Sequence, residues 1–154
     1  TFRHATMTIW PKLMQQRIVM ATENIFIDTS AFYALMDRSD THHEKAKRIW
    51  ILLLEERSHL HTTNYIMIES LALLQSRLGF EAAHLFARDI LGLVEFCWID
   101  KPQHSLAFEL WLSLGRRKVS LVDCVSFITM RHYKIENTFA FDKHFEEQGF
   151  TILN

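Results

Sequence analysis

Short apolar runs alternate with longer segments of helical periodicity along most of the chain. The apolar runs predict β-strands over residues 24–28, 60–63, 93–99, 138–141 and 150–153. The segments between them predict helices over residues 30–37, 41–56, 64–78, 80–91, 102–116, 120–133 and 142–149. Strands that are separated by helices pair in parallel and have both faces covered. The pattern therefore predicts an α/β fold with a central parallel β-sheet flanked by α-helices.

Residues 1–23 do not follow this alternation, which begins at Asn24. We interpret them as an N-terminal extension and note Met20 as an alternative start. No repeat or linker interrupts residues 24–154, so we expect these residues to form one domain. Within this domain, Thr41 followed by Glu44 predicts a capping box for the helix over 41–56.

The composition is that of a folded protein without a strong charge field. Hydrophobic residues make up 49% of the chain, and only 4 Gly and 2 Pro occur, which argues against disorder. The formal net charge of -1 gives no global attraction to a polyanion. A polyanionic partner would have to be held by a local basic patch or by metal ions.

Sequence features also indicate where the protein resides. No apolar run approaches the roughly 20 residues that span a bilayer, and the N-terminus lacks a signal-peptide profile. Cys97 and Cys124 lie in apolar runs without a Cys-x-x-Cys spacing, which predicts buried free thiols in a reducing compartment. We therefore expect a cytoplasmic protein that does not associate with membranes.

Two acidic residues stand where predicted strands end. Asp28 closes the run NIFID, and Asp142 follows the run TFAF. Ligands of parallel α/β sheets bind at the carboxyl ends of the strands, which would place both acids at a binding site. Either aspartate can also simply cap the helix that follows it.

Two further acids lie on predicted helices in apolar company. The neighbours of Glu69 at helical spacing are Tyr65, Ile66, Ala72 and Leu73. Asp123 lies on an almost wholly apolar helix, although Ser120 could cap that helix and leave Asp123 at a position that suits the helix dipole. A buried carboxylate is costly unless it is paired or binds a metal.

If these acids converge, a cation is needed to hold them together. Two carboxylates 4 Å apart repel by roughly 4 kcal/mol at an effective dielectric constant near 20. Oxygen-only ligands select Mg²⁺ or Mn²⁺, and carboxylate-held ions of this kind recur in phosphodiester cleavage. The sequence thus predicts a catalytic metal site formed by Asp28, Glu69, Asp123 and Asp142.

Hydroxyl groups and basic residues accompany the four acids. Thr29, Ser30 and Ser126 could orient carboxylates, or could serve as helix caps and helix packing. Candidate contacts to substrate phosphates are Arg116, Arg117, Lys118 and Lys143. A solvated turn explains the first three equally well. Phosphate contacts position a nucleic acid without reading its sequence.

Other chemistry is less well supported. His59 and His61 could share a strand face, but no Cys or His lies at zinc-site spacing from them. His144 could contact substrate in a minor role. Trp50, Trp98 and Trp111 fall in apolar elements, which favours packing or a dimer face over base stacking. The excess apolar surface of the first two helices could be covered by a dimer or by a partner protein.

Four segments resemble one known family. The segments IFIDTSAFYALMDRSDTHHEKA, TTNYIMIESLALL, SLVDCVSFITMRHY and FAFDKHFEEQGF are similar to the PIN domain, and more narrowly to VapC-type toxin ribonucleases of prokaryotic toxin–antitoxin pairs. They occur in the expected order from about residue 24 to the C-terminus. The extension before Asn24 departs from the family pattern, because members usually begin almost at the first strand.

This resemblance implies a PIN-like nuclease domain over residues 24–154. It implies a Mg²⁺- or Mn²⁺-dependent endoribonuclease that leaves a 5′-phosphate and a 3′-hydroxyl. The four family acids match Asp28, Glu69, Asp123 and Asp142, and the family hydroxyl one turn after the third acid matches Ser126. A homodimer inhibited by a small antitoxin protein is the expected assembly. The alternatives are a non-catalytic PIN-type module that binds RNA or protein, and a structure-specific DNA nuclease.

Overall fold

A computed structural model describes residues 23–154, so the predicted extension over residues 1–23 lies outside the described residues except for residue 23. The described part contains one parallel sheet with the strand order β3-β2-β1-β4-β5. Its strands are β1 (Asn24–Ile27), β2 (His59–Thr63), β3 (Glu95–Cys97), β4 (Asn137–Phe139) and β5 (Thr151–Ile152). The predicted central parallel sheet is confirmed.

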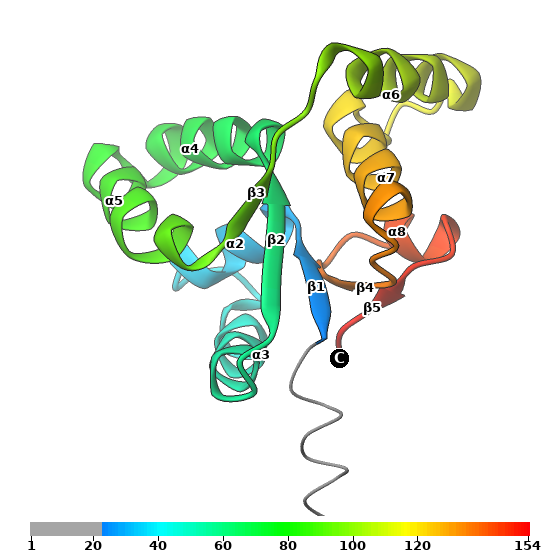
Figure 1. Cartoon of the computed structure of the whole chain (residues 1–154). Coiled ribbons are helices and arrows are strands. Elements are labelled where there is room, and N and C mark those ends of the chain that lie inside the picture. The colour runs from blue at the N-terminus through cyan, green and yellow to red at the C-terminus, as the bar shows by residue number, and fades with distance from the viewer. Residues whose placement is uncertain (1–22) are drawn as a thin grey trace, which may run out of the picture.

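Helices lie on both sides of this sheet (Figure 1). One side carries α2 (Thr29–Met36), α3 (His43–Glu55), α4 (Asn64–Leu78) and α5 (Phe80–Leu85). The other side carries α6 (Lys101–Leu114), α7 (Leu121–Tyr133) and α8 (His144–Glu147). The single helix predicted over residues 80–91 is divided, because α5 is followed by a π-helical turn, η1 (Phe86–Ile90), and a 3₁₀ turn, η2 (Leu91–Leu93).

The strand order reverses at β1, which places β1 between β2 and β4. Phe26 of β1 lies opposite His61 of β2 and Thr138 of β4. Beyond the last β1 residue, the Asp28 amide donates to the Phe139 carbonyl at 3.1 Å, so the carboxyl ends of β1 and β4 stay together. In open α/β sheets such a switch point is where ligands bind.

Side-chain caps start most of the longer helices. The Thr63 hydroxyl accepts from the Ile66 amide at the start of α4, and Asp100 forms a capping box with Gln103 at the start of α6. The capping box predicted at Thr41 is wrong. Helix α3 begins two residues later without a side-chain cap, because the carboxylate of Asp40 instead accepts from the His42 amide within the preceding turn, at 2.7 Å.

The core is built largely from phenylalanine rings. On one side of the sheet, Phe127 of α7 meets Phe145 of α8 edge-to-face at 5.2 Å between ring centroids, and Phe26 of β1 packs against Phe145. Near α2, Phe32 meets Phe86 edge-to-face at 5.0 Å. Each fully buried ring stabilises the fold by about 1.5 to 3 kcal/mol relative to an exposed one. This packing fixes α7 and α8 against β1 and β4.

Predictions about single residues had mixed outcomes. Cys97 and Cys124 are buried free thiols and Trp50 is buried, as predicted. Trp98 is 67% exposed, so it does not pack in the core, and the alternative that it belongs to a dimer face stays a prediction. Its strand, β3, is at the edge of the sheet and ends one residue before it. Within residues 23–154, none of the helices has the length and apolar character needed to cross a bilayer.

Candidate active site

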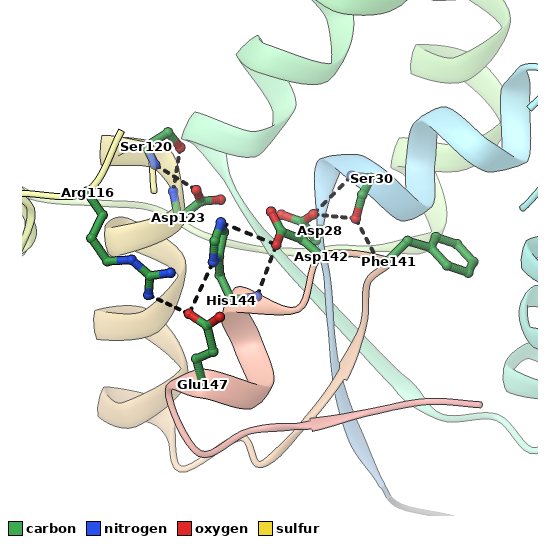
Figure 2. Close-up of polar contacts among 9 residues, drawn as sticks. All are labelled: Asp28, Ser30, Arg116, Ser120, Asp123, Phe141, Asp142, His144 and Glu147. Atoms are coloured by element: carbon green, nitrogen blue, oxygen red, sulfur yellow. Dashed lines mark hydrogen bonds and ion pairs between the residues drawn. The ribbon is translucent and has the colours of Figure 1, made fainter. Parts of the chain in front are cut away.

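The Asp28 carboxylate lies at the carboxyl end of β1, where it caps α2. Its Oδ2 accepts hydrogen bonds from the Ser30 amide at 3.0 Å and from the Ser30 hydroxyl at 2.5 Å. The Ser30 hydroxyl in turn accepts from the Phe141 amide at 3.0 Å (Figure 2). One hydroxyl therefore orients Asp28 and joins it to the segment after β4 that carries Asp142.

Replacing Ser30 by alanine removes this link. We expect Ser30→Ala to lower the free energy of unfolding by about 1 to 3 kcal/mol, because the Phe141 amide loses its partner in a partly buried site. Urea denaturation followed by circular dichroism measures the loss. Ser30→Thr keeps a hydroxyl and should lose much less, so equal losses in the two variants would contradict a role of the hydroxyl.

Glu69 approaches the site from α4, one turn after Tyr65. Together with Tyr65, Ile68 and Val122 it lines a largely apolar hollow of about 270 Å³. The hydroxyl of Thr29 lies close enough to lower the pKa of Glu69, and Thr29 also accepts from the Ser70 hydroxyl at 3.5 Å. Glu69 is therefore half-buried among apolar groups, as its sequence neighbours predicted.

Asp123 and Asp142 complete the acidic group from α7 and from the segment after β4. Asp123 occupies the third position of α7 in a capping box, where its Oδ2 accepts from the Ser120 amide at 2.7 Å and its amide donates to the Ser120 hydroxyl at 3.0 Å. The Oδ1 atom of Asp142 accepts from the His144 amide at 3.0 Å. Asp28 is thus the N-cap of α2, and Asp123 is the N3 member of the capping box of α7, as the capping alternatives predicted.

Electrostatic repulsion links Asp28, Glu69 and Asp123 to one another, and links Asp142 to Asp123. Burial raises the pKa of Asp28 to about 7, against the lowering effect of the Ser30 hydrogen bonds and with added repulsion from Asp123 and Glu69. Burial likewise raises the pKa of Glu69, and the charge of Asp123 adds to this. The pKa of Asp123 is also raised by burial, with Asp142 adding to the shift.

A chain of polar contacts connects Asp142 to the turn between α6 and α7 (Figure 2). The Arg116 guanidinium contacts the Glu147 carboxylate at 2.5 Å. The same carboxylate lies 3.3 Å from Nδ1 of His144, whose Nε2 lies 3.7 Å from the Asp142 carboxylate. Arg116 was predicted either as a phosphate contact or as part of a solvated turn. Glu147 was not predicted, although the i,i+3 spacing of His144 and Glu147 in HFEE is a local signal for their contact.

Comparison with known proteins identifies the family. The PIN domain model matches residues 25–150. The chain belongs to the PIN domain family. It is 34% identical over 129 residues to the 23S rRNA-specific endonuclease VapC20 of Mycobacterium tuberculosis, a match that covers 82% of this chain and 95% of the relative.

Solved PIN structures agree with this assignment. The crystal structure of M. tuberculosis VapC20, described as a sarcin–ricin loop-cleaving toxin, superposes with a TM-score of 0.75 at 33% identity and covers 82% of this chain and 96% of that one. VapBC2 from Rickettsia felis, bound to a DNA fragment from its promoter, has a TM-score of 0.65 at 10% identity, covering 85% and 98%. FitAcB from Neisseria gonorrhoeae has a TM-score of 0.61 at 16% identity, covering 84% and 96%. The latter two similarities concern the fold alone.

The acidic group of this PIN domain has the right donors for a hard cation. All four side chains offer carboxylate oxygens, and burial and mutual repulsion disfavour the ionised forms of Asp28, Glu69 and Asp123 unless positive charge is present. Within residues 23–154, no three His, Cys, Asp or Glu side chains are already arranged to hold an ion. The donor chemistry therefore fits Mg²⁺ or Mn²⁺, and binding would require side-chain rotations that draw the carboxylates together.

The remaining predicted residues fall into two groups. Ser126 is fully buried, and its hydroxyl donates to the Val122 carbonyl at 3.1 Å within α7, which is the helix-packing alternative. Arg117, Lys118 and Lys143 are exposed. Arg117 and Lys118 belong to the turn that ends immediately before α7, so they lie close in sequence to the helix start that carries Asp123.

Proposed function

We propose that this PIN domain is a Mg²⁺- or Mn²⁺-dependent endoribonuclease and the toxin of a type II toxin–antitoxin pair. The observation that carries the proposal is that Asp28, Glu69 and Asp123, which come from separate parts of the chain, repel one another in buried or half-buried positions, with Asp142 adding to the repulsion at Asp123. A purely structural site would not retain such mutually repelling groups in an apolar setting. The 34% identity to VapC20 over 129 residues supports ribonuclease chemistry.

The four acids share one task in this proposal, which is to bind the metal ions. Asp28, Glu69, Asp123 and Asp142 would hold the ions, and divalent-metal dependence is general among PIN-domain nucleases. When bound, such ions lower the pKa of water and neutralise charge on phosphate oxygens. Ser30 donates only to Oδ2 of Asp28, and the Ser120 amide only to Oδ2 of Asp123, so Oδ1 of each carboxylate takes no hydrogen bond from these serines.

The reaction is hydrolysis of one RNA phosphodiester bond. The oxygen of a water molecule bonds to phosphorus, the bond from phosphorus to the 3′ oxygen breaks, and that oxygen takes up a proton. The products are a 5′-phosphate and a 3′-hydroxyl. Arg117, Lys118 and Lys143 are exposed cations suited to neighbouring phosphates.

Partners follow from the same proposal. A small antitoxin protein would cover the site, and a homodimer would be the working assembly in the cytoplasm. Helix α3 leaves Ile51, Leu52 and Leu54 exposed, which provides apolar surface for one of these partners.

The test is cleavage of defined RNAs by the purified protein. A fragment containing the sarcin–ricin loop of 23S rRNA, an unrelated structured RNA and a flap DNA would be incubated with Mg²⁺ or Mn²⁺, and product ends would be mapped. We expect cleavage of RNA with 5′-phosphate products, and its loss in EDTA with recovery on adding excess Mn²⁺. RNA binding without cleavage would favour the non-catalytic module, and preferential cutting of the flap would favour a DNA nuclease.

A further inference from the structure

Four aromatic rings form a row that leads from α4 along α6. Tyr65 of α4 begins the row, and His104, Phe108 and Trp111 continue it. Positions 104, 108 and 111 are spaced by four and three residues, so they share one face of α6. Successive ring centroids lie 5.9, 6.4 and 5.7 Å apart. The row is therefore continuous.

The row is anchored at one end and open at the other. The Tyr65 hydroxyl and Nδ1 of His104 are joined by a hydrogen bond of 2.7 Å, and the His104 and Phe108 rings are stacked at an interplanar angle of 15°. Phe108 and Trp111 remain 41% and 38% exposed. Aromatic side chains have few torsions to restrict, so a planar ligand can stack on these two rings at low entropic cost.

Each end of the row lines a hollow in the surface. Tyr65 lines the apolar hollow that contains Glu69. Trp111 lines a second hollow of about 270 Å³ with Gly115, Arg116 and Arg117 among its other walls. This volume is below the roughly 300 to 1,000 Å³ of typical drug-sized sites, which suits one ring system.

The second hollow is also linked back to the acidic group. Arg116, in its wall, contacts Glu147, which in turn contacts His144 beside Asp142 (Figure 2). Helices α6 and α7 pack against each other, and the turn between them carries Arg116. The turn that follows the row is therefore joined to Asp142 by three successive polar contacts.

The positive charge beside the row favours a nucleic acid over a protein as its ligand. Arg116, Arg117 and Lys118 follow one another directly after α6. Within residues 23–154, neither Arg117 nor Lys118 has a carboxylate at ion-pair distance. Cores of protein–protein interfaces are depleted in charge, whereas single-stranded nucleic-acid sites combine stacking rings with cations.

From these contacts we infer that the α6 aromatic row is a stacking site for unpaired bases of the RNA substrate. One base stacks on Trp111 within the second hollow, and phosphates of the same strand lie at Arg117 and Lys118. RNA is commonly recognised through unstacked bases held on aromatic and guanidinium planes. The inference rests on the proposed function, because it describes how the substrate of that reaction is held.

Binding measured without cleavage tests the stacking site. Fluorescence anisotropy of fluorescein-labelled oligouridine would be recorded in EDTA with the full chain. We expect Trp111→Ala to weaken binding about tenfold, and Trp111→Phe to retain most of the affinity because it keeps a ring. Leu106→Ala is the matched control, since Leu106 is 53% exposed on the same helix outside the row, and it should bind like the wild type.

A second probe separates stacking from phosphate contacts. An oligoribonucleotide of the same length with abasic residues keeps the phosphates and removes the rings. Trp111→Ala and the wild type should bind it equally. Arg117→Gln should weaken binding of both probes and reduce the slope of log affinity against log salt concentration by about one.

Two results would overturn the inference. One is an equal loss of affinity of Trp111→Ala for both probes. The other is unchanged RNA affinity together with a change in sedimentation mass, which would make the row a face between protein copies. Trp111-dependent binding by a protein that cuts no RNA would refute the proposed function and leave the stacking site intact. RNA cleavage by the wild type, together with unchanged RNA affinity of Trp111→Ala, would refute the stacking site and leave the proposed function intact.

Discussion

Asp28→Asn is expected to lower the rate of RNA cleavage at saturating Mg²⁺ by at least about 1,000-fold. Charge stabilisation by a bound metal contributes several kcal/mol to such reactions, and each 1.36 kcal/mol is a factor of ten in rate. Asp28 is the most buried of the four acids and is repelled by both Glu69 and Asp123. The amide has nearly the same shape but no charge to hold the ion.

The measurement is single-turnover cleavage of an RNA that the wild type cuts. Asp123→Asn should behave in the same way, and the double variant should be little worse than either single one, because all act through one ion site. Titration calorimetry with Mn²⁺ should show heat of binding for the wild type and none for the double variant.

Asp89→Asn is the matched control for these substitutions. The Asp89→Asn substitution removes the same charge as Asp28→Asn, but Asp89 is exposed beside Arg88 in η1, away from the acidic group. Its cleavage rate should stay within about twofold of the wild type, as expected for a surface change. Full Mg²⁺-dependent cleavage by Asp28→Asn would refute the assignment of Asp28 to the site.

The fold and the four acids could be predicted because their signals are local. Each strand is a short apolar run and each helix has its own periodicity, so the parallel sheet follows from neighbouring residues alone. Glu69 was visible because its helical neighbours are apolar, and it is half-buried in the structure. Spacing could not show that Asp28 and Asp142 follow neighbouring strands, since that depends on the pairing of β1 with β4 across more than a hundred residues.

Features that depend on distant contacts were missed or misplaced. Arg116 and Glu147 are 31 residues apart in the sequence, so helical spacing could not predict their contact. Trp98 lies in the apolar run that predicted a strand, but edge strand β3 ends at Cys97, one residue before it. Trp111 was assigned to packing or to a dimer face, and helical periodicity does not distinguish a core-facing stripe from an exposed one. At these positions the local sequence pattern does not determine the contacts that the side chain makes in the fold.

The metal-free protein is expected to lose stability as the pH rises from 4 to 8. The pKa of Asp28 is about 7 in the folded state and 3.8 in the unfolded chain. Between these values the folded state holds a proton that the unfolded state has released, so the free energy of unfolding falls by about 1.4 kcal/mol per pH unit. The total loss is of the order of 4 kcal/mol and is complete once the pH exceeds the folded pKa. The raised pKa values of Glu69 and Asp123 act in the same direction.

Urea denaturation in EDTA across this pH range measures the effect, and Asp28→Asn isolates it. The variant has no proton to release at this position, so its stability should fall less steeply and should exceed that of the wild type at pH 8. Mn²⁺ should stabilise the wild type more at pH 8 than at pH 5, because the ion binds ionised carboxylates and only the folded state assembles them. Parallel pH profiles for wild type and variant would mean that Asp28 is ionised at low pH like a surface aspartate. In that case the acidic group would not need a cation, and the reason for placing a metal there would be lost.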